Sequence, residues 1–90
     1  MDETLIQKRI IDKLAKFVPP KWNESHTEEK NIFKCFPGHL RGTKQVKDAY
    51  EELIRKEFII RYKKTGETHI SLNIRKKKEI EEFMESGLSP

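Results

Sequence analysis

The sequence predicts an α+β fold in which three helices precede a β-hairpin and a fourth helix ends the chain. Apolar residues recur at intervals of three or four up to residue 54, as on the buried face of a helix. The interval changes to two across residues 58–74, and a Gly-containing turn at residues 64–67 separates two alternating runs, as in a hairpin. Ninety residues are too few for two domains, so we expect one domain over residues 1–90.

The first segment has the pattern of an amphipathic helix. Its expected apolar stripe consists of Ile6, Ile10, Leu14 and Phe17, with Ile11 and Val18 on the flank. Asp2 or Thr4 can cap the start of this helix. Pro19-Pro20 stops it, because a proline disfavours helical geometry in the residue before it.

A linker over residues 21–26 and a short second helix come next. Ser25 and Glu28 have the spacing of a capping box, and Thr27 is a competing cap. The helix is expected over about residues 28–35, where it would bury Ile32 and neighbouring phenylalanines. Pro37-Gly38 breaks it and makes a turn.

The third helix, over residues 43–57, has the clearest pattern in the chain. Its one-sided apolar stripe is Val46, Ala49, Tyr50, Leu53 and Ile54. Thr43 follows Gly42 and is the expected cap.

The hairpin is expected over residues 58–73, and a last helix over about residues 75–86. Asn73 can cap this helix, and Gly87 is expected to end it. Its buried residues would be Ile80, Phe83 and Met84.

Two helices joined by a short turn and followed by a hairpin make a helix-turn-helix with a wing. The chain resembles the winged helix-turn-helix superfamily, and within it small archaeal winged-helix proteins of undetermined role. The resemblance is carried by Phe17-Val18-Pro19-Pro20-Lys21-Trp22, by His26-Thr27 through Phe36-Pro37-Gly38-His39-Leu40-Arg41, and by Ser71-Leu72-Asn73. It implies a three-helix core, a β-hairpin wing, a C-terminal helix and an archaeal character, and it implies no particular ligand.

The net charge of +4 is unevenly spread along the chain. Residues 37–78 hold twelve bases and five acids, whereas residues 79–90 hold four acids and no base. Such polarity suits a partner that is a polyanion, although an uneven solvated surface is the simpler alternative. The single cysteine excludes an internal disulfide, and no apolar run is long enough to span a membrane. We therefore expect a soluble, cytoplasmic protein without a membrane partner.

The first half of the third helix carries side chains that can read base edges in a major groove. Lys44 and Lys47 can reach guanine acceptors or phosphate, and Gln45 can pair with adenine. The same helix face also holds acids at i,i+4 spacing, such as Asp48 after Lys44. The alternative is therefore that these charges only solvate and brace the helix.

Basic residues at three other places are candidates for phosphate contacts. Arg61, Lys63 and Lys64 lie in the expected wing, although lysines also protect exposed strand edges against aggregation. Lys76 belongs to a basic run that opposes the dipole at the start of the last helix, so local helix physics does not account for it. Arg41 lies just before the third helix.

The sequence gives little support for a metal site or for catalysis. The soft ligand candidates are His26, Cys35, His39 and His69, and they lack the two close pairs usual in structural zinc sites. No nucleophile elbow and no phosphate-cradling loop is present. We expect no enzyme activity, no cofactor and no small-molecule ligand.

The leading hypothesis is a regulator that binds double-stranded DNA. The expected contacts are Arg41, Thr43, Lys44, Gln45, Lys47, Arg61, Lys63, Lys64 and Lys76. Four to six neutralised phosphates would give a slope of about −4 to −5 for log affinity against log salt. A homodimer through the terminal helices, with Ile11 and Phe83-Met84 in the contact, is expected from topology. The alternative functions are a protein-interaction module and, third, RNA binding.

Overall fold

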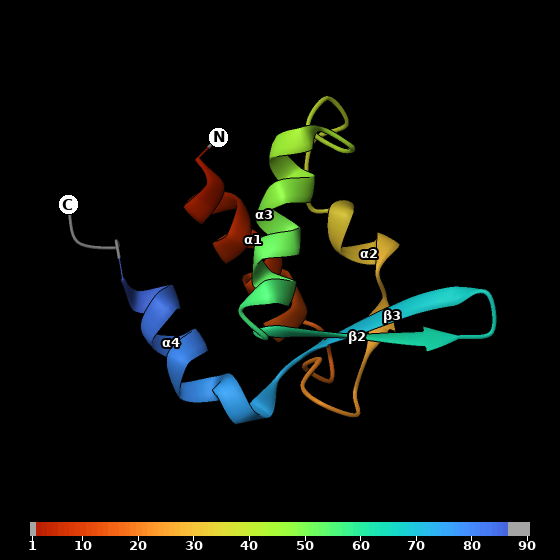
Figure 1. The fold of residues 1–90 in the computed structure, drawn as a ribbon, viewed down its shortest axis with the longest axis vertical. Coiled ribbons are helices and arrows are strands. Elements are labelled where there is room, and N and C mark those ends of the chain that lie inside the picture. Colours follow the sequence, from red (N-terminus) through yellow and green to blue (C-terminus); the bar gives the residue numbers. More distant parts are fainter. Residues whose placement is uncertain (1, 87–90) are drawn as a thin grey trace.

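The computed structural model describes residues 2–86 and has an α+β fold. Its elements in chain order are α1 (Glu3–Ala15), β1 (Thr27–Glu28), α2 (Lys30–Phe33), α3 (Lys44–Arg55), β2 (Ile59–Lys64), β3 (Glu67–Leu72), the 3-10 turn η1 (Ile74–Lys76) and α4 (Lys77–Glu85). The strands form an antiparallel sheet in the order β1-β3-β2. Figure 1 shows α1 and α3 together above the sheet, with the β2–β3 hairpin extending to one side and α4 on the other.

Helix α1 forms over most of its predicted stripe, but Phe17 lies beyond its end and is half-buried. The Asp2 carboxylate accepts a hydrogen bond from the Thr4 amide at 2.9 Å and so caps the helix. Ile6, Ile10 and Leu14 are completely buried. Ile11, expected on the flank of this stripe and in a dimer contact, is only 2% exposed and so offers almost no surface to a partner. The helix ends at Ala15, before the two prolines.

Helix α3 packs against α1 through its own apolar stripe. The Thr43 hydroxyl accepts from the Val46 amide and donates to the Leu40 carbonyl oxygen, which confirms Thr43 as the cap. Val46, Ala49, Tyr50 and Leu53 are buried. Between the helices, the buried Gln7 amide donates to the carbonyl oxygen of Ala49 at 3.1 Å. The bond satisfies a polar group inside the core, which would otherwise be costly to bury.

The segment between α1 and α3 differs most from the expectation. Residues 27–28, predicted as a cap and first helical turn, form the strand β1 instead. Thr27 lies opposite Ile70 of β3 and Glu28 lies opposite His69. Helix α2 is consequently only Lys30–Phe33, shorter than expected. Backbone hydrogen bonds to the long β3 strand stabilise residues 27–28 in the extended form, and they outweigh local preference.

Further backbone hydrogen bonds join the same edge of β3 to the residues on either side of β1. The Leu72 amide donates to the Lys21 carbonyl oxygen, and the Asn23 amide donates back to Leu72. At the other end the Glu29 amide donates to the Thr68 carbonyl oxygen at 2.8 Å. The edge of β3 that faces away from β2 is therefore occupied by residues 21–29.

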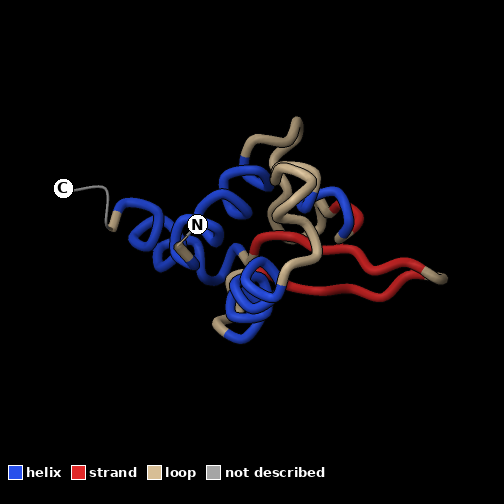
Figure 2. Tube along the Cα trace, turned by 90° about the horizontal axis from the view of Figure 1, so that it is seen from above, coloured by secondary structure: helices blue, strands red, loops and turns tan. Residues whose placement is uncertain are grey.

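The hairpin forms as predicted, with Ile59 opposite Leu72 and Lys64 opposite Glu67. Gly66 has a φ of 73°, in the left-handed region that glycine adopts without a steric penalty. Figure 2 shows the hairpin reaching well beyond the helices. Ile59, Ile70 and Leu72 at its root are buried in the core, whereas its tip is exposed.

Helix α4 follows the hairpin after a 3-10 turn that the sequence did not indicate. Asn73 caps this turn by accepting from the Arg75 amide, and its own amide side chain donates to the Glu57 carbonyl oxygen. Ile80 of α4 is buried, and Phe83 packs edge-on against Phe58 with ring centroids 5.9 Å apart. The helix ends at Glu85 with Ser86 as its C-cap; the expected stop at Gly87 lies outside the described residues.

Candidate nucleic-acid interface

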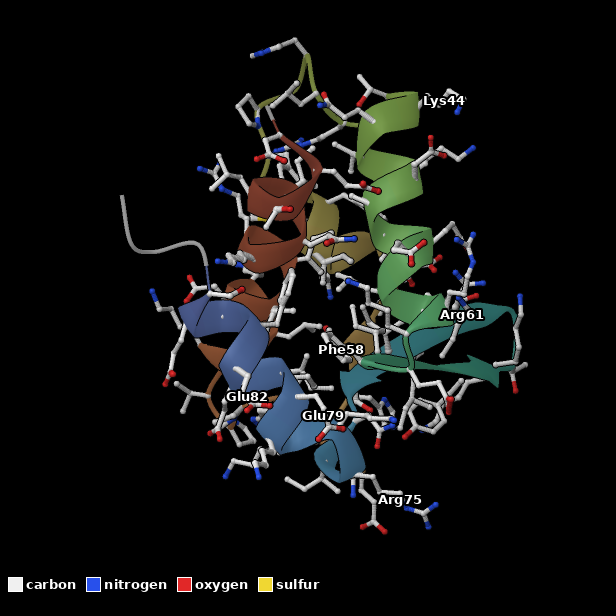
Figure 3. The ribbon with its side chains drawn as sticks, turned by 60° about the vertical axis from the view of Figure 1, so that its left-hand side comes forward. Lys44, Phe58, Arg61, Arg75, Glu79 and Glu82 are labelled. Carbon is white, nitrogen blue, oxygen red and sulfur yellow. The ribbon has the colours of Figure 1, made fainter. Side chains whose placement is uncertain are left out.

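The candidate interface combines the exposed face of α3 with the hairpin. Figure 3 shows Lys44 at the upper end of α3 and Arg61 at the root of the hairpin along one side of the molecule, whereas Glu82 of α4 lies on the opposite side. The structure thus places Lys44 and Arg61, seventeen positions apart in sequence, along the same side, away from acidic α4.

The first two turns of α3 present three polar side chains and the cap. Lys44 is exposed, and its ammonium lies 2.7 Å from the Asp48 carboxylate, a bond that raises the lysine pKa. Lys47 and Gln45 are also exposed, and Lys47 makes no ion pair within residues 2–86. The Thr43 hydroxyl is occupied by the cap. Lys47 is therefore the cation of these turns whose charge is not balanced by a neighbouring carboxylate.

Arg41 serves the loop that leads into α3. Its guanidinium donates to the carbonyl oxygen of Phe36 at 2.8 Å and to that of Lys34 at 3.2 Å. These carbonyls belong to the end of α2 and the residues after it, where helical partners run out. These two hydrogen bonds give Arg41 a structural role in the loop. Only the exposed edge of its guanidinium is available to contact a phosphate.

Arg61 fastens the root of the hairpin to the helices. Its guanidinium lies 2.8 Å from the Glu51 carboxylate of α3, 3.4 Å from that of Glu29, and over the Tyr50 ring. The Tyr50 hydroxyl donates to Glu29, and burial together with this carboxylate raises the pKa of Tyr50. Arg61 is thus surrounded by carboxylates and sets the angle between the hairpin and α3.

The two lysines near the hairpin tip lie on opposite faces of the sheet. Side chains alternate along a strand, so Lys63 shares the face of Arg61, and Lys64 shares that of Tyr62. The Arg61 contacts turn the first face towards α3. Lys63 therefore extends the α3 surface towards the tip, whereas Lys64 lies on the reverse face.

Lys76 lies apart from the other candidates. It is half-buried in η1, and its ammonium is 3.9 Å from the Glu79 carboxylate. Its neighbour Arg75 lies at the lower end of the molecule in Figure 3, away from Lys44. The next residue, Lys77, lies over the Trp22 ring at 5.9 Å. The basic run at the start of α4 is thus partly explained by contacts inside the domain.

The outer face of the sheet carries a histidine pair that the sequence did not reveal. Nδ1 of His26 and Nδ1 of His69 are 2.9 Å apart, although the residues are 43 positions apart. Nε2 of His69 lies 2.9 Å from the Glu67 carboxylate. The pairing depends on β1, whose two residues give no alternating pattern, so no signal in the sequence could have found it.

Among the described residues, no three His, Cys, Asp or Glu side chains are grouped so that they could hold a metal ion. Cys35 is half-buried, and burial raises the pKa of its thiol. Within residues 2–86, every helix is too short or too polar to span a bilayer.

An apolar groove lies between α1 and α4. Its floor includes Ile11, Ala15, Trp22 and Ile80, and its rim carries Asp12, Glu81, Met84 and Glu85. This groove belongs to the acidic side of the molecule.

Comparison of the chain with models of protein families, with curated proteins and with solved structures finds no match. Support for a function therefore comes from the geometry and charge of the chain itself.

Proposed function

We propose that this chain is a winged helix-turn-helix domain that binds double-stranded DNA and acts as a transcriptional regulator. The support for the winged-helix assignment is the order of elements: α2 and α3 follow one another along the chain, joined by the ten-residue segment 34–43, and the β2–β3 hairpin comes next. The start of α3 would enter the major groove, where Lys44, Gln45 and Lys47 meet base edges and phosphates.

The observation that carries the proposal is the segregation of charge around α3 and the hairpin. On the α3 side, the acids Asp48, Glu51 and Glu29 are each within ion-pair distance of a base. On this side, the charges of Lys47 and Lys63 are therefore not balanced by a neighbouring carboxylate. On α4, the carboxylates of Glu81, Glu82 and Glu85 make no ion pair within residues 2–86. A phosphate backbone is attracted by the first surface and repelled by the second.

The structure also lowers the expected number of phosphate contacts. Arg41, Arg61 and Lys44 are engaged inside the domain, so Lys47, Lys63 and Lys64 are the cations available without rearrangement. Because each neutralised phosphate contributes about −0.9, log affinity against log salt should have a slope of about −2.7. Lys64, on the reverse face of the hairpin, would contact the backbone only if the tip lies between two phosphate strands or along the minor groove.

Fluorescence anisotropy on duplex DNA at several salt concentrations tests the proposal. Lys47→Gln and Lys63→Gln should each make the slope shallower by about 0.9. Lys16→Gln is the matched control, because Lys16 pairs with Asp12 at the α1–α4 groove. No binding at micromolar protein, or equal losses for all three variants, would overturn the proposal.

A second candidate function is docking of another protein, and the α1–α4 groove favours it. Its floor is apolar and its rim is acidic, which suits a partner helix that has basic residues on both sides of an apolar ridge. Titration with such a basic amphipathic peptide would test this function. Saturable binding that Ala15→Glu abolishes and Lys47→Gln leaves unchanged would support it over DNA binding.

A further inference from the structure

The His26–His69 pair joins the segment before β1 to the middle strand of the sheet. The two Nδ1 atoms are at hydrogen-bond distance, 2.9 Å, and the ring planes meet edge to face at 80°. On the far side of the His69 ring, Nε2 bonds the Glu67 carboxylate. The chain of groups is therefore carboxylate, imidazole, imidazole.

This chain of hydrogen bonds exists only in certain protonation states. A bond between two Nδ1 atoms needs a proton on one of them and a lone pair on the other. If both rings are cationic, both Nδ1 atoms carry protons, the bond is lost and two positive charges face each other at short range. The pair therefore holds together only while at least one ring is neutral.

The groups around the pair decide which ring stays neutral. Glu67 faces His69, and its hydrogen bond with that ring lowers the pKa of the Glu67 carboxyl. On the other ring, burial, Lys64 of β2, His69 itself and Lys21 of the preceding loop all lower the pKa of His26. His26 is thus the ring of the pair that resists protonation.

Three further groups complete the surroundings. The Tyr62 ring of β2 lies 5.6 Å from the His26 ring and is tilted against it at 44°. Glu28 of β1 lies opposite His69, and Lys30 of α2 binds the Glu28 carboxylate at 3.1 Å. The Glu28 carboxyl also shares a hydrogen bond with that of Glu67, so both acids lie on the His69 side of the pair.

We propose that the His26–His69 pair is a pH-sensitive contact between the β1 segment and β3. It holds the β1 segment on β3 at neutral pH and releases it when His26 takes up a proton. A metal ion is not the better occupant, because the described residues supply no third ligand beside the two imidazoles. The proposal rests on the sheet geometry and does not depend on DNA binding.

The sign of the pH effect follows from the proton count. In the unfolded chain His26 binds a proton below about pH 6.5, whereas the folded chain resists that proton. The unfolded state then holds more protons, so stability is fully present above about pH 6.5 and falls as the pH is lowered. One proton changes the folding constant by at most about tenfold per pH unit.

The local readout is amide hydrogen exchange at Glu29, measured on the full chain. The Glu29 amide bonds the Thr68 carbonyl oxygen and reports on attachment of the β1 segment. Its protection factor should fall by up to about tenfold per pH unit between pH 6.5 and 5. The Lys47 amide, which bonds Thr43 in α3, is the internal reference and should change much less.

Two variants complete the test. His26→Gln should remove the pH dependence at Glu29, whereas His39→Gln, an exposed histidine in the turn before α3, should leave it as in the parent chain. If His26→Gln does not fold, an NMR titration of the parent chain decides the matter, because bonded rings titrate in two coupled steps. Independent single-step titration of His26 and His69, or a pH-independent protection factor at Glu29, would overturn the proposal.

Discussion

Replacing Asp48 with asparagine tests whether α3 meets phosphate directly. Asp48 is the acid nearest the start of the helix, and it holds the Lys44 ammonium at 2.7 Å. Asn keeps the shape of the side chain but removes its negative charge. The variant therefore frees Lys44 and removes one repulsive group from the proposed DNA surface.

The size of the effect can be worked out from counterion release. One additional lysine–phosphate contact makes the salt slope steeper by about 0.9, from about −2.7 to about −3.6. At 0.1 M salt this corresponds to about eightfold tighter binding, and at 0.2 M to about fourfold. Folding should be little affected, because the side chains of Lys44 and Asp48 are both mostly exposed.

Fluorescence anisotropy with one duplex at four salt concentrations measures both the affinity and its slope. Glu82→Gln is the matched control, because it changes net charge by the same amount on the opposite side of the molecule (Figure 3). Screening over a Debye length of about 10 Å at 0.1 M limits the effect of that distant charge. Equal gains for Asp48→Asn and Glu82→Gln, or an unchanged slope for Asp48→Asn, would refute a direct α3–phosphate contact.

Three further predictions concern folding and assembly. Asn73→Ala should lower the free energy of unfolding by about 1–3 kcal/mol, because it removes a cap and a bond to the Glu57 carbonyl oxygen; urea denaturation measures this, and no change would contradict the capping role. Leu53→Ala should lower the free energy of unfolding by about 2–5 kcal/mol in the same assay, since the Leu53 side chain of α3 is completely buried in the core. If the terminal helices form a dimer, Met84→Glu should shift the mass measured by light scattering towards the monomer, and a monomeric parent chain at every concentration would disprove the dimer.

Local patterns were sufficient to predict α1, α3 and the hairpin. The α3 stripe has one clear period, and Thr43 stands where a cap is needed, so the helix begins where expected. Asp2 likewise caps α1. At the hairpin, the change of period at Phe58 and the glycine at position 66 were enough to place both strands and the turn.

Contacts between distant segments could not be predicted in the same way. Residues 27–28 are polar and too few to show alternation, and they become a strand only because β3 offers unpaired backbone groups. The His26–His69 pair depends on that strand. The engagement of Arg61 by Glu29 and Glu51 also depends on how the hairpin meets two helices. By contrast, the opposite orientation of Lys63 and Lys64 follows from strand alternation and was predictable.

The coverage of β3 leaves β2 as the open edge of the described sheet. Residues 21–29 occupy the outer bonds of β3, so β2 (Ile59–Lys64) is the longer of the two edge strands, and β1 on the other edge has only two residues. Strand β2 carries Arg61, Lys63 and Lys64, whose mutual repulsion between copies discourages stacking of sheets into fibrils. Replacing these lysines with apolar residues would therefore remove a safeguard against fibril growth.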